Sequence, residues 1–375
     1  MTGSQALTNE HFIMASGQGP VDYELDVCAR LDTTVYVVEC KAGTLTEAAR
    51  RGAEHSVKSD LVDLLAGAQR QTARAIESFR ADAVDLSRLR DFAAGAEEFI
   101  PVIVTLDHTG SMTTDIETVR EQPFGRAPWI VSLLDLYTLA DLLEKPWRFK
   151  HYVRRRIDVL RDDRTVIAFD ELDIYETYRR FNVCAFPPGG SHTVFVVPTN
   201  DIDLYYAALP GRGVRKPTRK VPRPIGELIS DLESCGATGW TDVACDYLDL
   251  NHATQAHLSR SMRRMQAQAA LGAELSISRL YDDRKGRGWA YCAIAGIPDD
   301  DTMMLAHAYL IDRVDDVPKW LIVIHDPAAK AVMHGVYERV DGKMVLSGRS
   351  LRVGEDALTM RPMRRPKSFA FDEQN

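Results

Sequence analysis

Four charged residues near the start of the chain have the types and spacing that phosphodiester hydrolysis requires. Glu24 and Asp26 alternate with apolar residues in VDYELDV, and Glu39 and Lys41 do the same in VYVVECK. Because successive side chains of a strand point to opposite faces, each pair is expected to project to one side of its own strand. If the two strands pair, the three carboxylates and the ammonium group meet.

Such a group supplies what the hydrolysis of a phosphodiester needs. The reaction requires fixed groups that neutralise phosphate charge, activate a water molecule and assist the leaving oxygen. Asp26 and Glu39, with the backbone carbonyl of Cys40, offer the hard oxygen ligands that suit Mg²⁺ or Mn²⁺. Lys41 could orient the attacking water. Burying these charges beside apolar strands is costly, so we expect a metal ion or a substrate to satisfy them.

The surrounding pattern predicts the elements that position these residues. Two β-rich runs, 21–30 and 33–41, flank a turn at Leu31 and Asp32 and predict an antiparallel pair. Apolar residues at helical spacing predict a long amphipathic helix over 58–80. Later runs predict strands over 100–106 and 129–133 and helices over 134–144, 147–156 and 170–180. This order is typical of an α/β fold with a mixed central sheet flanked by helices.

The length of 375 residues favours two domains. The first is predicted over 1–185, followed over 186–224 by a strand at 193–198 and a basic, proline-rich linker. The third region, 225–375, is helical to about 271 and then has apolar runs that predict strands over 289–298, 320–326 and 332–340. We therefore expect a second α/β domain, whose role the sequence does not indicate.

The residues of the first domain resemble the PD-(D/E)xK nuclease superfamily, also called restriction-endonuclease-like. The resemblance covers about residues 18–145: GPVDYELDV, then the E-x-K of VVECKAG with Glu39 thirteen residues after Asp26, then a helix carrying glutamine. It implies a restriction-endonuclease-like core, a metal site at Asp26 and Glu39, and a catalytic Lys41. It also implies a supporting role for Glu24 and for Gln71, with Gln69 as the other choice. The resemblance is closest to the type IV restriction and defence-associated branch.

The chain departs from that family before the first catalytic strand. Members of the family usually have a helix there that bears a further acid, and here only about twenty residues precede the strand, with Glu10 as the candidate acid. Three explanations stay open: a short helix, a start that lies inside a longer protein, or another segment in place of the helix.

Composition restricts the classes of partner and compartment. The six cysteines form no C-x-x-C pair, which argues against a disulfide framework or a zinc site and indicates a reducing, cytoplasmic compartment. The first residues lack the pattern of a signal peptide, and no apolar run is long enough to span a membrane. A net charge of −8 is the wrong sign for coating nucleic acid nonspecifically, so a polyanion must be met by local basic patches.

Two basic segments are candidates for such patches. The linker residues Arg212, Arg215, Lys216, Arg219, Lys220 and Arg223 either grip phosphates or form a solvated linker. The helix WRFKHYVRRR, 147–156, either contacts DNA or closes the first domain.

Two other clusters invite a metal interpretation, and in each the plainer account is favoured. His252 and His257 are five residues apart, a spacing that does not place them on one helical face. Asp170, Glu171 and Asp173 have the arrangement of acids at a helix start.

The sequence thus predicts a metal-dependent endonuclease that hydrolyses DNA, with prokaryotic defence and partner defence proteins implied by the resemblance alone. Cutting both strands of a duplex needs two sites, so a homodimer is an open alternative. The rival hypothesis is a catalytically inactive nucleic-acid-binding or scaffold protein that retains the nuclease fold. A second rival places the chemistry in the C-terminal domain, where the sequence offers no comparable group.

Overall fold

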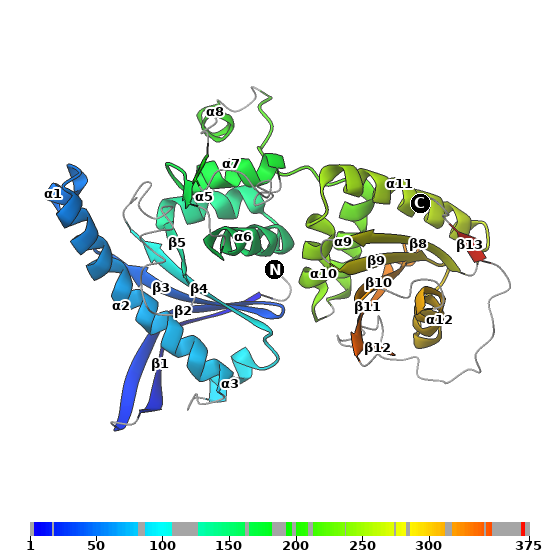
Figure 1. Ribbon diagram of the computed structural model, residues 1–375, viewed down its shortest axis with the longest axis horizontal. Helices are drawn as coiled ribbons and strands as arrows, with labels where there is room; N and C mark the ends of the chain where they lie inside the picture. Colours follow the sequence, from blue (N-terminus) through cyan, green and yellow to red (C-terminus); the bar gives the residue numbers. More distant parts are fainter. Residues whose placement is uncertain are drawn as a thin grey trace. The chain divides into compact units, whose positions relative to one another are not determined.

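Two large mixed sheets organise the chain, one in each of two units, residues 1–220 and 221–375 (Figure 1). The computed structural model describes residues 4–16, 19–81, 87–106, 127–161, 165–181, 193–196, 200–208, 213–236, 238–273, 275–282, 286–311, 317–340, 343–346 and 369–371. Both sheets combine parallel and antiparallel pairs and have helices packed on them, which confirms the predicted α/β class.

The first unit is built on a five-stranded sheet with the order β1-β2-β3-β4-β5. Its strands are β1 (Ser4–Ser16), β2 (Gly19–Leu31), β3 (Thr34–Lys41), β4 (Glu98–Thr105) and β5 (Trp129–Ser132). β1, β2 and β3 are antiparallel neighbours, whereas β3, β4 and β5 run parallel. The carboxyl ends of β3, β4 and β5 therefore meet at one edge of the sheet.

A tight turn sets the register between β2 and β3. Asp32 has φ of 55°, a left-handed conformation that aspartate tolerates better than most residues. The pair Leu31↔Thr34 closes the hairpin, and pairing continues to Val27↔Val38. The predicted antiparallel pair is confirmed, with its turn at Asp32 and Thr33.

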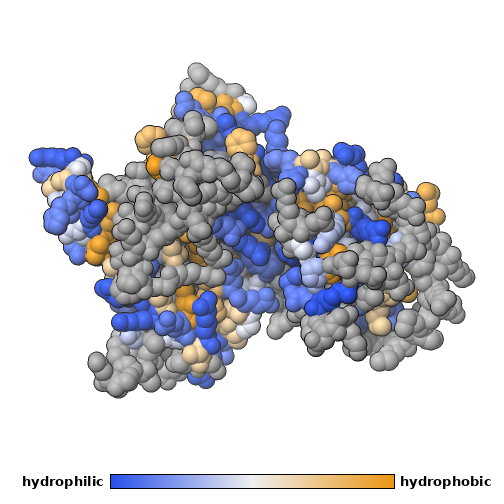
Figure 2. All heavy atoms as spheres, viewed as in Figure 1, coloured by the Kyte–Doolittle hydropathy of each residue, from blue (hydrophilic) through white to orange (hydrophobic). Residues whose placement is uncertain are grey.

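Helix α2 packs on one face of this sheet. The helices of the unit are α1 (Glu47–Arg50), α2 (Glu54–Arg80), α3 (Ser87–Ala93), α5 (Leu133–Leu143), α6 (Pro146–Arg161), α7 (Glu171–Phe181) and α8 (Asp201–Ala207). In α2, Leu61, Leu65 and Ala68 recur at helical spacing and pack on Ile103 and Ile130 of the sheet. Hydrophilic residues gather over α1 and the start of α2, at the left of Figure 2.

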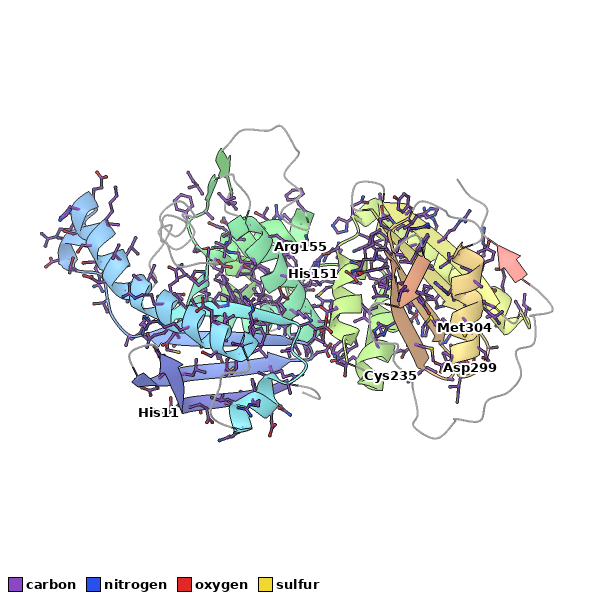
Figure 3. All side chains as sticks on the ribbon, turned by 60° about the horizontal axis from the view of Figure 1, so that its bottom comes forward. His11, His151, Arg155, Cys235, Asp299 and Met304 are labelled. Atoms are coloured by element: carbon purple, nitrogen blue, oxygen red, sulfur yellow. The ribbon has the colours of Figure 1, made fainter. Side chains whose placement is uncertain are left out.

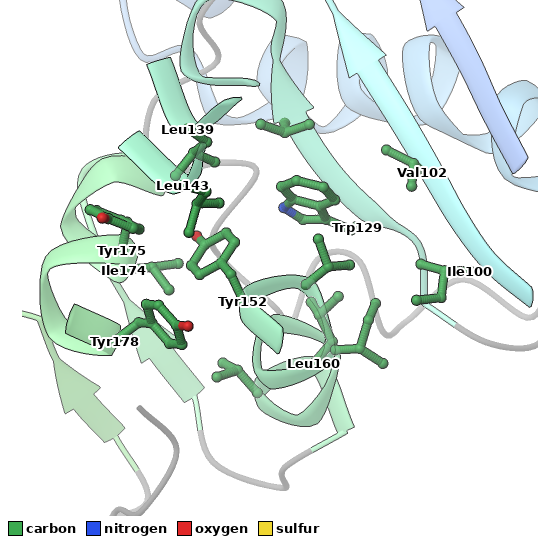
Figure 4. Close-up of a cluster of buried hydrophobic side chains, with 14 of the residues drawn as sticks. Ile100, Val102, Trp129, Leu139, Leu143, Tyr152, Leu160, Ile174, Tyr175 and Tyr178 are labelled. Carbon is green, nitrogen blue, oxygen red and sulfur yellow. The ribbon is translucent and has the colours of Figure 1, made fainter. Parts of the chain in front are cut away.

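The opposite face of the sheet carries the largest core cluster of the unit. Trp129 lies at its centre, near Tyr152 of α6 and Leu139 of α5 (Figure 4). The indole N–H of Trp129, the Tyr152 hydroxyl and the Arg156 guanidinium all donate to the Glu171 carboxylate. Because Arg156 and Glu171 are both almost fully buried, this network ties α6 and α7 to the sheet.

A short parallel pair completes the first unit. It joins β6 (Thr165–Ile167) to β7 (Thr193–Phe195), the latter within the strand predicted at 193–198. The residues 213–222 have no regular structure, as predicted for the basic segment, but most of them belong to the first unit. The Tyr175 hydroxyl donates to the carbonyl of Pro217, and Arg148 donates to that of Arg219, so this segment packs back on α6 and α7.

The second unit has a six-stranded sheet with the order β12-β11-β10-β9-β8-β13. Its elements are α9 (Arg223–Cys235), α10 (Trp240–Leu248), α11 (His252–Ala270), β8 (Leu275–Asp282), β9 (Arg287–Ala293), α12 (Asp300–Ile311), β10 (Lys319–Asp326), β11 (Ala331–Val340), β12 (Lys343–Leu346) and β13 (Phe369–Phe371). α12 packs on β10 through Met303, Ala306 and Leu310, while α9 packs on β11 and α11 on β8 and β9. A second α/β unit is thus present.

Substitution of a single core residue tests this packing. Leu139→Ala, at a fully buried position of α5, is expected to lower the free energy of unfolding of the first unit by about 2–5 kcal/mol, because it leaves a cavity beside Trp129. Tyr137→Ala on the same helix removes a side chain that is 77% exposed and is expected to change stability by less than about 0.5 kcal/mol. Denaturant unfolding followed by Trp fluorescence measures both, and equal losses would contradict the assigned burial.

Candidate active site at the carboxyl end of β3

Asp26 lies where the pairing of β2 with β3 ends. Beyond the last pair, Val27↔Val38, the Asp26 carboxylate accepts a hydrogen bond from the backbone N–H of Cys40, at 2.7 Å from Oδ2 to N. The Asp26 side chain thus accepts a hydrogen bond from β3 where the backbone pairing of the two strands has ended. Asp26 is thereby fixed beside the last residues of β3.

The backbone carbonyl of Cys40 points to the side of β3 that faces β2, where Asp26 lies. The carbonyl of Lys41 accepts from Leu106, directly after β4, so the backbone of Lys41 faces β4. Because consecutive strand residues direct their backbone groups to opposite edges, those of Cys40 face β2 and Asp26. The predicted third oxygen ligand therefore lies beside the Asp26 carboxylate.

Glu39 is buried beneath α2. It shares a strand face with Val35 and Val37, is the register partner of Ile103, and is 1% exposed. Its Oε2 lies 3.5 Å from the Lys41 ammonium nitrogen, while its Oε1 is buried without a hydrogen-bond partner among the described residues. A buried carboxylate oxygen without a partner is costly, and this is the strongest sign that the site accommodates a further group.

The two carboxyl groups are in contact. Burial, followed by the hydrogen bond to Asp26, raises the pKa of Glu39 to about 8, while the charge of Lys41 opposes the shift. Around neutral pH without a cation, Glu39 therefore holds a proton, which a cation bound at the two carboxyls would displace.

Lys41 is held by the helix that covers the site. Its ammonium group donates to Oε1 of Gln71 on α2 at 3.1 Å, and its side chain is 26% exposed. Of the two glutamines that the sequence offers, Gln71 makes this contact. Gln69 is buried, with an amide nitrogen that has no partner in the described part of the chain.

Asp26, Glu39 and the Cys40 carbonyl fit a hard divalent cation. They provide two adjacent carboxyl groups, of which one oxygen has no partner in the described ranges, and a neutral carbonyl oxygen beside them, the donor set that Mg²⁺ and Mn²⁺ prefer. Within the ranges that the structure covers, no three His, Cys, Asp or Glu side chains gather as a metal site. Any ion held here would complete its shell with water or substrate oxygens, as Mg²⁺ usually does.

Glu24 does not join this group. Its carboxylate is exposed and lies 3.9 Å from His11, which Figure 3 labels on β1. Leu25 and Cys28 both belong to the core beneath α2, although strict alternation would separate them. The alternation is therefore broken around Asp26, opposite Asn9 with its positive φ of 52°, and Glu24 faces solvent beside His11.

The segment before β2 is a strand, not a helix. β1 pairs with β2, and Glu10 forms an ion pair with Arg88 of α3 at 3.0 Å. A strand therefore occupies the segment directly before β2, and Glu10, the candidate acid, is engaged with Arg88.

The basic segment before the second unit is only partly open to solvent. Arg219 is buried, beside His151 and over the ring of Tyr178, and Lys216 pairs with Asp141 and Glu144. The phosphate-binding interpretation is therefore wrong for Arg219 and is not supported for Lys216. Arg215 and Lys220 are exposed, Arg223 pairs with Glu227, and Arg212 lies outside the described residues.

The other sequence clusters have structural roles. In α6, Trp147, Lys150, His151 and Arg156 are buried, so this helix closes the first unit (Figure 3). Asp170 and Asp173 accept backbone N–H groups at the start of α7, as expected for acids at a helix start. His252 and His257 are exposed on α11, whereas Asp246 pairs with Arg287.

The sequence did not single out Thr105 and Ser132. Thr105 of β4 is the register partner of Lys41 on β3 and of Ser132 on β5. The side chains of Thr105 and Ser132 are buried at the carboxyl ends of β4 and β5. Ser132 also accepts from the N–H of Asp135 and so caps α5. The available signal was a polar residue at the end of each apolar strand, where parallel sheets place their sites.

No protein-family model, curated protein or solved structure matches this chain. The resemblance to PD-(D/E)xK nucleases is therefore carried by the motif residues themselves. Among the described residues, no helix has the length and apolar character to cross a membrane.

The burial of Glu39 predicts a pH-dependent stability. The folded chain keeps the Glu39 proton up to about pH 8, whereas the unfolded chain loses it near 4.5, so without metal the stability falls as the pH rises through this window. Glu39→Gln removes this fall and is expected to be more stable than the wild type by on the order of 2 kcal/mol above about pH 8.

Denaturant unfolding in EDTA at several pH values measures this difference. Glu24→Gln, at an exposed carboxyl of the neighbouring strand, is the matched control and should follow the wild-type profile. If the stability of Glu39→Gln depended on pH in the same way as that of the wild type, the assigned rise in the pKa of Glu39 would be contradicted.

Proposed function

We propose that this protein is a metal-dependent nuclease that hydrolyses DNA phosphodiester bonds at Asp26, Glu39 and Lys41. The observation that carries the proposal is the buried Glu39 carboxyl, which contacts Asp26, lies 3.5 Å from the Lys41 ammonium and retains an oxygen without a partner among the described residues. Two carboxylates and a lysine at the carboxyl end of β3 form a group whose burial is costly unless it binds a charged ligand.

Each residue has a separate role in this proposal. Asp26 and Glu39, with the Cys40 carbonyl, hold Mg²⁺ or Mn²⁺, and Asp26 is oriented by its bond to the Cys40 N–H. Lys41 positions the attacking water and offsets phosphate charge, and Gln71 fixes the ammonium group in place. When bound, the divalent cation neutralises charge on the scissile phosphate and favours ionisation of the attacking water.

A restriction-endonuclease-like core is part of the same proposal. The antiparallel β2–β3 hairpin, the parallel β3, β4 and β5, and the long α2 carrying Gln71 support it, as does the E-x-K on β3. The strand β1 in the place of the usual helix is a difference from that family.

The biological setting follows from the resemblance. It suggests a cytoplasmic enzyme of prokaryotic defence that cuts foreign DNA together with partner defence proteins. Cleavage of both strands would bring two copies of the site together as a homodimer.

Removal of the lysine tests catalysis. Lys41→Ala is expected to lower the rate of Mg²⁺-dependent DNA cleavage by about 100-fold or more, because it deletes a charged group beside the reacting phosphate, while DNA binding survives. Plasmid, linear duplex and single-stranded DNA, and RNA, assayed with Mg²⁺ or EDTA, identify the substrate.

Lys58→Ala, at an exposed lysine that pairs with Glu54 on α2, is the matched control and should cut as the wild type does. Full function in Lys41→Ala would instead identify a noncatalytic nucleic-acid-binding or scaffold protein.

Metal binding can be tested without cleavage. Near pH 7, Mn²⁺ binding is expected to release up to about one proton, because the pKa of Glu39 is about 8 and a metal ligand must be deprotonated. Calorimetry in buffers of different ionisation enthalpy counts the proton. Tight Mn²⁺ binding that persists in Asp26→Asn and Glu39→Gln would remove these residues from the metal site.

A further inference from the structure

Helix α11 is a basic element in an acidic chain. Its 19 residues, HATQAHLSRSMRRMQAQAA, include three arginines and two histidines but no carboxylate, although 54 of the 375 residues of the chain are acidic. The helix therefore departs from the charge balance of the rest of the protein.

The basic residues share the outer side of the helix. Leu258, Met262 and Met265 are buried on the side that packs on β8 and β9 (Figure 1). The exposed basic residues are His252, His257, Arg260, Arg263 and Arg264. At about 100° per residue, these five lie within an arc of about 140°. The stripe that they form is named here the α11 basic face.

Two arginines of this face have no counterion among the residues that the structure describes. Neither Arg260 nor Arg263 has a hydrogen bond or ion pair in the part of the chain that the structure describes. By contrast, in the same unit Arg223 pairs with Glu227 and Arg287 with Asp246. Arginines gathered without carboxylates attract polyanions, since their charge is not offset locally.

The shape of the helix suits the phosphates that flank a groove of duplex DNA. α11 is about 28 Å long, and a helix of ordinary diameter enters the major groove. Ala256 and Ala267 are exposed on the same side of the helix, so the backbone can come close to a partner there. Three residues, 249–251, join α10 to α11, a connection length typical of helix-turn-helix units, whose second helix binds the groove.

We propose that the α11 basic face binds duplex DNA, chiefly through the contacts of Arg260 and Arg263 with phosphates. The choice of DNA among polyanions rests on the proposed nuclease function. The existence of the α11 basic face does not depend on that function. The second unit would thus supply duplex affinity, and the site at Asp26, Glu39 and Lys41 the cleavage.

Fluorescence anisotropy of a labelled duplex, titrated with the full chain in EDTA, measures binding without cleavage. Arg260→Ala/Arg263→Ala is expected to weaken binding tenfold or more and to reduce the salt dependence of log K by about two, one for each lost phosphate contact. Alanine favours helix, so the double variant should fold, and circular dichroism checks this.

Arg223→Ala, at an exposed and paired arginine of the same unit, is the matched control and should bind as the wild type does. Arg260→Lys/Arg263→Lys should keep the wild-type salt dependence, because the charge remains.

Wild-type affinity and salt dependence in the double alanine variant overturn the inference. So does a double variant that loses binding to anionic lipid vesicles or to polyglutamate but not to the duplex. If the wild type binds duplex through these arginines yet cleaves no nucleic acid with Mg²⁺, the inference stands and the proposed catalytic function fails.

Discussion

The contact between the carboxyl groups of Asp26 and Glu39, beneath α2 and beside the Lys41 ammonium, is the constraint on which the first unit depends. Two acids and a base held near apolar residues are unfavourable unless each charge is balanced. Lys41, the Cys40 N–H and a retained proton provide that balance in the free chain. A divalent cation would replace the proton, which couples ligand binding to the ionisation of Glu39.

The sheet around this contact is organised so that the site is both rigid and open. β3 is the central strand, Glu39 is paired with Ile103 of β4, and the next residue, Cys40, donates its N–H to Asp26 of β2. α2 buries Glu39 while its Gln71 holds Lys41 at the margin. The buried network of Glu171 with Trp129, Tyr152 and Arg156 stiffens the opposite face. The proposed catalytic geometry would require such support from rigid elements.

The second unit differs from the first in the polar groups that it buries and in those that it exposes. Its sheet packs against α12 and against α9 and α11, and several of its polar side chains are buried. The chain of hydrogen bonds from Gln266 through Tyr291 and His325 to Asp231 is an example, since Tyr291 and His325 are almost fully buried. What this unit presents to solvent on α11 is positive charge, which suits a role in binding more than one in chemistry.

The alternation in VDYELDV and VYVVECK was enough to predict the hairpin and the Asp26–Glu39–Lys41 group, and the order of helical and apolar runs predicted an α/β fold, because periodicity and E-x-K spacing are local properties. The same alternation placed Glu24 wrongly, since it is broken around Asp26, opposite Asn9 with its positive φ. Only the tertiary structure selected Gln71 over Gln69, showed the strand β1 before β2, and buried Arg156 and Arg219 of the two basic runs whose roles the sequence left open. Each of these features depends on contacts with residues distant in the chain, such as Glu171 for Arg156 and Tyr178 for Arg219. The sequence around a residue does not show which distant residues it contacts.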